Sequence, residues 1–358
     1  MSLNPLAADL DDIVSRAEPW LRRLAGERLF ITGGTGFFGR WLLEALTWAD
    51  DRLDLRLRIT VLSRDPETFT RRASVLATHH SLDWWRGDVR DFTPPPGSFP
   101  FVIHTATAAS EQLNRTQPLL MFDTITSGTR RVLEFADHAG CTAMLLTSSG
   151  AVYGPQPAHI ERLDESHPGA PDPNSPASAY GEGKRAAEFL CAASGLPVKI
   201  ARGFAFVGPF LPFDAHFAVG NFMRDLLHGR PIDIQGDGTP YRSYLYAADL
   251  VVWLLAVLLD GQPNRPYNVG SDVAVSIADL AHAVATAGGD DRVRIQGTPS
   301  GQPPTRYVPS ITRARDELGL EVWTPLDQAL QRTLRWARAQ DPSFERTPNI
   351  HAIQADAS

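Results

Sequence analysis

The chain contains little cysteine, no excess of basic residues and no long apolar run. Its 358 residues include only Cys141 and Cys191, too few for a disulfide framework or a cysteine metal cluster. We therefore expect a reducing, cytoplasmic setting and no metal site. The net charge of −7 argues against a nucleic-acid partner, because a basic surface is needed to bind phosphates. The longest apolar stretch, residues 250–259, falls short of the about 20 residues that cross a bilayer. The N-terminus does not resemble a signal peptide, so we expect no membrane association.

Short apolar segments alternate with helical patterns from Arg28 onwards. Strands alternating with helices predict a parallel sheet covered on both faces, with ligands at the carboxyl ends of its strands. The expected fold class is therefore α/β, with a Rossmann-like doubly wound sheet. We expect strands at 28–32, 57–62, 84–86, 101–105, 143–148 and 198–202, and helices at 37–49, 66–77, 119–139 and 178–194.

The pattern becomes less regular after Arg202, which predicts a smaller C-terminal α/β domain for the substrate. Residues 267–269 read as a strand that returns to the first sheet. The expected division is a helical leader outside the main fold, a dinucleotide-binding domain with a return segment, a substrate-binding domain in two pieces, and a poorly ordered tail. The leader spans residues 1–25, and the dinucleotide-binding domain spans 26–202 with its return segment at about 246–271. The substrate-binding domain consists of 203–245 and 272–345, and the tail is 346–358.

A glycine-rich turn joins the first strand to the first helix of this pattern. Gly33, Gly36 and Gly39 give the spacing G-x-x-G-x-x-G, and Phe37 and Phe38 begin the helix. Glycines allow a tight turn and a close backbone approach to a pyrophosphate, while the helix N-terminus supplies amide donors. The turn therefore predicts a site for NAD(P).

The end of the second strand bears on the choice between NAD and NADP. An acidic residue there would bind the ribose diol of NAD, but this chain has Ser63 and Arg64. A guanidinium can pair with a 2′-phosphate, so Arg64 favours NADP. Asp65 follows directly, and a solvated Arg64 is the alternative.

Two further strand ends are predicted to line the cofactor. Asp88, with Val89 beside it, is placed to contact adenine, although a turn role for Asp88 remains open. Thr105 and Ala106 should lie along the cofactor after the fourth strand. His104, at the end of that strand, is expected to be structural.

Tyr180 and Lys184 are the strongest candidates for catalysis. They are four residues apart and so share one helix face. A neighbouring ammonium favours the phenolate, which predicts a lowered pKa for Tyr180. The hydroxyl-rich segment that ends at Ser149 precedes them.

Together these motifs resemble the extended short-chain dehydrogenase/reductase superfamily, in particular the NAD-dependent epimerase/dehydratase family. The resemblance covers roughly residues 28–340. It implies an enzyme that modifies nucleotide-diphosphate sugars through a nicotinamide cofactor. The matching segments are residues 32–39, 88–89, 147–154, 180–184, 242 and 267–270.

The resemblance implies roles for three catalytic residues. Tyr180 would be the acid-base, Lys184 would hold the nicotinamide ribose, and Ser149 would hydrogen-bond the reacting oxygen. Dehydratases of the family have acidic residues at the two positions after this hydroxyl, and related decarboxylases have a glutamate at the second. Gly150 and Ala151 stand there and cannot transfer a proton. This departure disfavours dehydration and decarboxylation.

The resemblance also implies substrate contacts. Asn221, Arg242 and Arg306 would contact the diphosphate at one pocket, and Ile232 would lie against the base. Ala205 replaces an asparagine that many family members use there, which weakens the assignment of a particular substrate.

A nucleotide-sugar epimerase is the leading functional hypothesis. An NADPH-dependent 4-ketoreductase of a 4-keto-6-deoxy nucleotide sugar is the close alternative. A non-catalytic dinucleotide-sensing protein and a reductase of small carbonyl compounds are further alternatives. Two long helices, at 119–139 and 178–194, are candidates for a homodimer interface.

Overall fold

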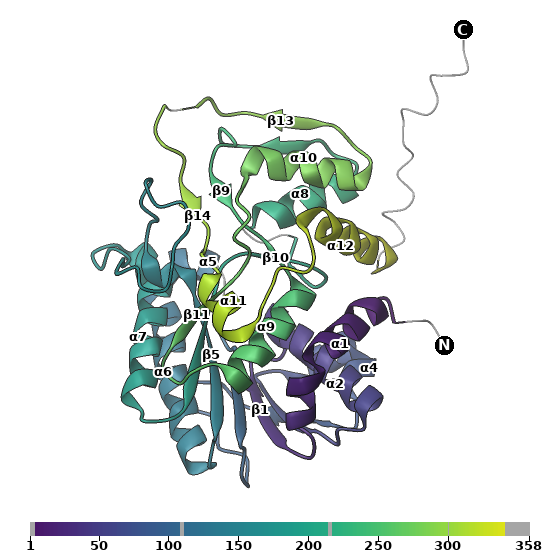
Figure 1. Ribbon diagram of the computed structural model, residues 1–358, viewed down its shortest axis with the longest axis vertical. Helices are drawn as coiled ribbons and strands as arrows, with labels where there is room; N and C mark the ends of the chain where they lie inside the picture. Colours follow the sequence, from purple (N-terminus) through teal and green to yellow (C-terminus); the bar gives the residue numbers. More distant parts are fainter. Residues whose placement is uncertain (1–3, 108–110, 214–216, 300, 341–358) are drawn as a thin grey trace.

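A single seven-stranded parallel sheet forms the centre of the computed structural model (Figure 1). The structure describes residues 4–107, 111–213, 217–299 and 301–340, so the expected tail at 346–358 lies outside the described residues. The strand order is β3-β2-β1-β4-β5-β6-β11, and every pairing is parallel. The order reverses beside β1, which is the usual ligand position of a Rossmann-like sheet. The predicted fold class is confirmed. The strands are β1 Arg28–Thr32, β2 Arg58–Ser63, β3 Leu82–Arg86, β4 Phe101–His104, β5 Ala143–Ser149, β6 Val198–Gly203 and β11 Pro266–Val269.

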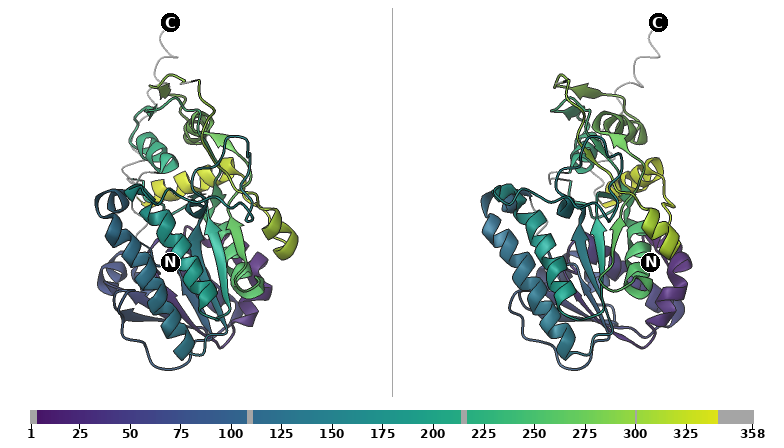
Figure 2. Two further views of the ribbon diagram at one scale, coloured as in Figure 1. Left: turned by 90° about the vertical axis from the view of Figure 1, so that its left-hand side faces the viewer. Right: turned by 60° about the vertical axis from the view of Figure 1, so that its left-hand side comes forward.

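Helices cover both faces of this sheet (Figures 1 and 2). One face is covered by α6 and α7, which pack against each other, and the other by α1, α2 and α9. The helices of this part are α1 Ala7–Arg23, α2 Phe37–Leu53, α3 Pro66–Arg72, α4 Ser74–Ala77, α5 Glu111–Thr116, α6 Pro118–His138, α7 Ala179–Ala193 and α9 Ala247–Asp260, with short 3-10 turns η1 Gly150–Tyr153 and η2 Pro176–Ser178.

The sequence pattern predicted that the helix at the N-terminus lies outside the main fold, but in the structure α1 packs against the main fold. Its apolar stripe, which includes Leu10, Ile13 and Leu21, is fully buried against α2 and α9. Burying three such side chains contributes several kcal/mol, on the order of 1.5–3 each. The leader is therefore an integral layer of the part built on the central sheet.

The apolar run at 250–259 forms the centre of α9. Its residues from Leu250 to Leu258 are at most 1% exposed, because the helix lies between the sheet and α1. Within the described residues, no helix combines the length and apolar composition needed to cross a bilayer.

Smaller elements cover the carboxyl ends of the central strands (Figure 2). They form three short sheets, in the orders β10-β7, β12-β9-β14 and β13-β8. Strand β11 returns to the central sheet beside β6, as predicted. The remaining elements are β7 Phe206–Val207, α8 Ala218–Leu227, β8 Ile232–Ile234, β9 Tyr241–Arg242, β10 Leu245–Tyr246, β12 Val275–Ser276, α10 Ile277–Gly288, β13 Val293–Ile295, β14 Arg306–Tyr307, α11 Thr312–Leu318 and α12 Leu326–Gln340.

Candidate active site

The glycine turn between β1 and α2 has the geometry of an anion-binding loop. Gly33 has φ +74°, and a Cβ there would lie 2.6 Å from the backbone nitrogen of Ala106. A Cβ at Gly39 would overlap the Gly33 carbonyl, whereas a Cβ at Gly36 would lie 3.4 Å from the Gly33 carbonyl oxygen, an ordinary contact. Gly36 is the N-cap of α2 and offers no capping side chain. Among the described residues, no side chain caps the start of α2, so its first amides are available and the loop fits a pyrophosphate.

The loop after β4 is tied to this turn through Thr32. Thr105 donates its hydroxyl to the Thr32 carbonyl at 2.7 Å, and the Ala106 amide donates to the Thr32 hydroxyl at 3.2 Å. His104 lies between the hydroxyls of Thr32, at 2.7 Å, and Thr129, at 3.1 Å. Burial, with a smaller contribution from the Lys184 charge, lowers the pKa of His104 to about 3. The ring is neutral and structural, as the sequence indicated.

The end of β2 presents an exposed basic side chain, Arg64. Besides the hydrogen bonds from Arg90, its charge contributes to the lowered pKa of Asp88. Both oxygens of Asp65 accept hydrogen bonds from Thr68, so Asp65 caps α3. Ser63 is buried, while Arg64 is exposed. In the described parts of the chain, the Arg64 side chain has no recorded hydrogen bond or ion pair, and Arg86 approaches the Arg64 carbonyl at 3.4 Å. This corner can accept an anionic group.

Asp88 is engaged by a neighbouring arginine. Its Oδ1 accepts from the Arg90 backbone at 3.0 Å and from Arg90 Nε at 2.9 Å, and this pairing lowers the pKa of Asp88. Val89 is buried and lies against Gly128 of α6. A contact of Asp88 with adenine stays a prediction.

Lys184 is held on the buried side of α7 by two oxygen acceptors. Its Nζ donates to Thr107 Oγ1 and to the Thr147 carbonyl, both at 2.8 Å. Burial lowers the pKa of Lys184 to about 8. The same Nζ lies 5.9 Å from the centre of the Tyr180 ring. Two threonines, one in the loop after β4 and one in β5, therefore fix the ammonium beside Tyr180.

The pKa of Tyr180 differs from the sequence-based expectation. Burial raises this pKa, and a hydrogen bond with Ser149 offsets part of that effect. Burial and Ser149 are the causes of the shift, and the Lys184 ammonium donates to Thr107 and Thr147. The Tyr180 phenol is therefore protonated at pH 7 in this geometry, with the Ser149 hydroxyl close enough for a hydrogen bond.

Tyr307 of β14 joins Tyr180 and Ser149 to form a cluster of three hydroxyl groups. Tyr307 was not identified as a site residue from the sequence. Its phenol is close enough to Ser149 for a hydrogen bond, and its ring packs on Phe204 with centroids 4.7 Å apart. A Cβ at Gly150 would lie 2.7 Å from the Tyr307 oxygen. The phenol thus occupies the space that a side chain at position 150 would need. The only sequence signal was that Tyr307 directly follows the candidate Arg306.

A buried polar network fixes the segment after Tyr307. Leu163 pairs with this segment on both sides, through Val308 at 2.9 Å and Ser310 at 2.7 Å. Asn268 of β11 donates its side-chain amide to the carbonyls of Leu163 at 2.8 Å and Ser310 at 3.1 Å. The segment that carries Tyr307 is therefore bonded to both a surface loop and the central sheet.

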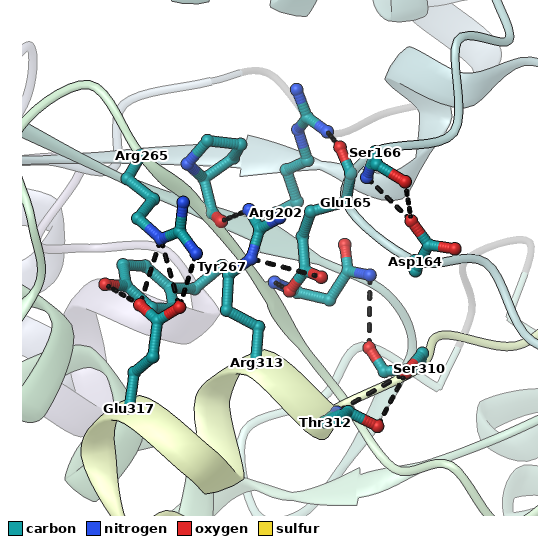
Figure 3. Close-up of polar contacts among 12 residues, drawn as sticks. Asp164, Glu165, Ser166, Arg202, Arg265, Tyr267, Ser310, Thr312, Arg313 and Glu317 are labelled. Atoms are coloured by element: carbon teal, nitrogen blue, oxygen red, sulfur yellow. Dashed lines mark hydrogen bonds and ion pairs between the residues drawn. The ribbon is translucent and has the colours of Figure 1, made fainter.

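Figure 3 shows how charged residues support the same loop. Arg313 of α11 lies 3.7 Å from the buried Glu165 and donates to the Pro266 carbonyl at 2.8 Å. Arg202 of β6 approaches the Glu165 carbonyl at 3.4 Å, and the Glu165 side chain accepts the Asn268 backbone amide at 2.8 Å. These contacts join β6, β11 and α11 behind Tyr307.

The two candidate phosphate-binding arginines lie on neighbouring strands but on opposite faces of them. In the parallel pair β9–β14, Arg306 is in register with Tyr241, and Arg242 is in register with Tyr307. The Arg306 guanidinium lies over the Tyr241 ring, 4.4 Å from its centre. Side chains in register share a face, so Arg242 is the arginine on the Tyr307 side. From the sequence, we expected both arginines at one diphosphate pocket, whereas their side chains lie on opposite faces of the strand pair.

The other two substrate candidates occupy different environments. Asn221 is half-buried on α8, in the part that covers the strand ends. Ile232 of β8 is 1% exposed and belongs to the main hydrophobic core. Contacts of these residues with a nucleotide stay predictions. The side chain of Ile232 is buried in the core, so little of its surface is available to a ligand.

Comparisons with known proteins agree with this geometry. The sequence profile of the NAD dependent epimerase/dehydratase family matches residues 29–270. UDP-glucuronic acid decarboxylase 1 of Xenopus tropicalis is 29% identical over 318 residues, which are 88% of this chain and 73% of that protein.

Two solved structures share the fold. A double mutant of DesIV, the dTDP-glucose 4,6-dehydratase of Streptomyces venezuelae, superposes with a TM-score of 0.74 at 24% identity, covering 89% of this chain and 99% of that one. UDP-glucose 4-epimerase of Thermotoga maritima gives 0.71 at 22% identity, with coverages of 87% and 99%. The profile match extends over more than half of the chain. The chain therefore belongs to the NAD-dependent epimerase/dehydratase family of extended short-chain dehydrogenases/reductases.

Proposed function

We propose that this chain is a nucleotide-sugar epimerase that changes the configuration of one carbinol carbon through a transient ketone. The observation that carries the proposal is the hydroxyl cluster of Tyr180, Ser149 and Tyr307. Positions 150 and 151 hold no carboxylate, and the Tyr307 phenol fills the space beside Gly150. Proton transfer at one oxygen is supported, whereas the second acid or base that elimination requires is missing at these positions.

The residues around the glycine turn fit a dinucleotide. The turn at Gly33–Gly39 and the amides of α2 would hold its pyrophosphate, and Lys184 would hold the ribose next to the reacting ring. A bound nicotinamide supplies the two-electron oxidation and reduction of the sugar carbon. Tyr180 would first lose its own proton, and its phenolate would then accept the hydroxyl proton as the ketone forms and return it afterwards. Ser149 would hydrogen-bond the reacting oxygen and keep it in line with Tyr180.

The β9–β14 strand pair supports recognition of a diphosphate. Arg242 lies on the Tyr307 face of this pair, so its cation is near the hydroxyl cluster and can neutralise phosphate oxygens. Arg306, stacked on Tyr241, and Asn221 on α8 would contact more distant parts of the nucleotide. A decarboxylase and an epimerase of UDP sugars are among the similar proteins, which supports testing UDP sugars first.

The test is to incubate the purified full chain with a panel of UDP- and dTDP-hexoses and to follow the products by NMR. The proposal predicts a second epimer at equilibrium without net consumption of cofactor. No epimer from any sugar of the panel, together with retained dinucleotide binding, would instead favour a dinucleotide-sensing protein.

An NADPH-dependent 4-ketoreductase is the second candidate, and Arg64 favours it. The exposed Arg64, with Asp65 committed to capping α3, leaves a positive corner where a 2′-phosphate would lie. NADP preference is therefore part of our proposal, and NADPH is the common soluble reductant. Oxidation of NADPH by a 4-keto-6-deoxy nucleotide sugar would support the reductase. No oxidation across several such sugars would exclude it.

We also propose that the chain forms a homodimer through α6 and α7. Phe189 of α7 is 71% exposed, and Leu119 and Phe122 of α6 are 84% and 37% exposed. Three large apolar side chains on two adjacent helices favour burial against a partner. Light scattering should give a dimer for the wild type and a monomer for Phe189→Glu. A monomeric wild type would contradict the proposal.

A further inference from the structure

Three potential metal ligands meet at the amino end of the central sheet, opposite the strand ends that carry the candidate active site. Asp50 lies in the last turn of α2, and His79 and His80 lie between α4 and β3. One carboxylate oxygen and one ring nitrogen from each histidine all lie within 4.8 Å of one another. The fold therefore brings together a set of nitrogen and oxygen donors from two separate segments.

Asp50 presents a buried oxygen without a hydrogen-bond partner. The residue is 3% exposed, and its Oδ1 accepts the Leu57 backbone amide at 2.9 Å. Within the described ranges, its Oδ2 has no hydrogen bond, and an unpaired buried carboxylate oxygen is costly. The carboxyl end of α2 adds negative potential at the same point. A cation at Oδ2 would relieve both effects.

His80 approaches this oxygen in a way that suits a shared cation. Its Nε2 lies 3.1 Å from Asp50 Oδ2, yet the two atoms are not aligned for a hydrogen bond. Two ligand atoms about 2.0–2.2 Å from a tetrahedral ion lie about 3.3–3.6 Å apart, slightly more than this separation. The His80 side chain is 70% exposed, so its ring can turn toward an ion without disturbing the core.

His79 is already oriented by a second contact. Its Nδ1 lies 2.8 Å from the hydroxyl of the buried Ser81. The Ser81 backbone amide donates to Nδ1 at 3.3 Å, so Nδ1 holds the lone pair in this structure. An ion at Nε2 would require the proton on Nδ1 instead, where the Ser81 hydroxyl can accept it. The same Nε2 lies 3.2 Å from Asp51 Oδ1, a contact that must open when an ion binds. Asp51 is not in the group of mutually close donors, so water would complete the coordination.

We propose that Asp50, His79 and His80 form a site for a divalent transition-metal ion of the zinc class. Imidazole and carboxylate donors suit Zn²⁺, Co²⁺ or Ni²⁺. The ion would join the end of α2 to the segment before the edge strand β3, so its role is structural and independent of hydride chemistry. Sequence analysis predicted no metal site, because the residues are 29 positions apart and match no spacing motif.

The test is a metal titration of the untagged full chain after treatment with a chelator. Co²⁺ should give visible absorption bands of a tetrahedral ion, saturating at one equivalent, and Zn²⁺ should displace it. His80→Ala should weaken Co²⁺ binding at least about ten-fold. Zn²⁺ should raise the melting temperature of the wild type but not that of His80→Ala.

His138→Ala is the matched control, because His138 is an exposed histidine at the end of α6. It should bind Co²⁺ as the wild type does. Asp50→Asn removes the anionic ligand and should also abolish binding. If Asp50→Asn does not fold, the Co²⁺ titration of His80→Ala still tests the proposal, because His80 is exposed. Equal Co²⁺ affinity in the wild type, His80→Ala and His138→Ala would overturn the proposal, as would no saturable binding.

Discussion

The Tyr307 phenol lies 2.7 Å from the point where a Cβ at Gly150 would stand. The glycine is therefore matched to a tyrosine from β14, 157 positions later in the chain. In related dehydratases, position 150 would carry an acid, as the resemblance implies. In this chain, a glycine stands at that position and a phenol lies where the acidic side chain would be. The change at position 150 therefore agrees with a reaction that needs no second acid.

Gly150→Ala should test this relationship most simply. The added methyl group meets the phenol and Phe204, so we expect a loss of about 1–3 kcal/mol in unfolding free energy and reduced turnover. Gly236→Ala is the control, because nothing lies within 4 Å of its Cβ position. Equal stability of the two variants would show that Tyr307 does not restrict position 150.

Tyr307→Phe should lower kcat more than it raises KM, because the phenol contacts Ser149 beside the reacting oxygen. The ring remains to pack on Phe204, so the melting temperature should change little. Steady-state kinetics with a thermal melt separates the two effects. An unchanged kcat would assign Tyr307 to packing alone.

Tyr180→Phe should reduce turnover by about 10²–10⁴-fold, the usual contribution of a general acid-base. Dinucleotide affinity, measured by calorimetry, should be retained because Lys184 keeps its bonds to Thr107 and Thr147. Tyr241→Phe serves as a control outside the hydroxyl cluster. Turnover within two-fold of the wild type in Tyr180→Phe would refute the assigned role.

Arg64→Asp should weaken NADP binding by about 10–100-fold, since charge-assisted hydrogen bonds contribute about 1.5–3 kcal/mol. NAD binding should be maintained or improved, because the new carboxylate can accept the ribose hydroxyls. Arg72→Asp, an exposed arginine on α3, controls for net charge. Similar losses in both variants would point to a general electrostatic effect.

His104 should make the wild type sensitive to acid. Its folded pKa of about 3 lies below the ordinary value of 6.5, so the unfolded chain binds the extra proton between these values. Stability is therefore lost as the pH falls through this window, by about 1.4 kcal/mol per pH unit. Urea titrations of wild type and His104→Gln should show a flatter pH dependence in the variant. Parallel profiles would contradict the neutral buried ring.

Local patterns predicted the parts of the site that are local in sequence. The glycine turn and the α7 pair Tyr180 and Lys184 each lie within a single strand–helix junction or helix, so their spacing carries the geometry. The alternation of strands and helices likewise predicted the parallel sheet, including the return of β11.

Long-range packing determines the position of Tyr307 and the acceptors of Lys184, which the sequence analysis did not predict. Tyr307 reaches Ser149 because β14 pairs with β9 and the following segment pairs with Leu163. The Lys184 ammonium is bonded to Thr107 and Thr147, and burial is the main cause of the raised pKa of Tyr180. Neither arrangement has a signature in residue spacing, because both depend on which distant strands meet.

The most direct test of the account is the mass and configuration of the product formed from each nucleotide sugar, including UDP-glucuronic acid. Mass spectrometry with NMR should be applied to wild type and Tyr180→Phe in parallel. The account predicts a product of unchanged mass with one inverted carbon, dependent on Tyr180, or a gain of two hydrogens if the ketoreductase alternative holds. Loss of water or of carbon dioxide from the sugar would contradict it.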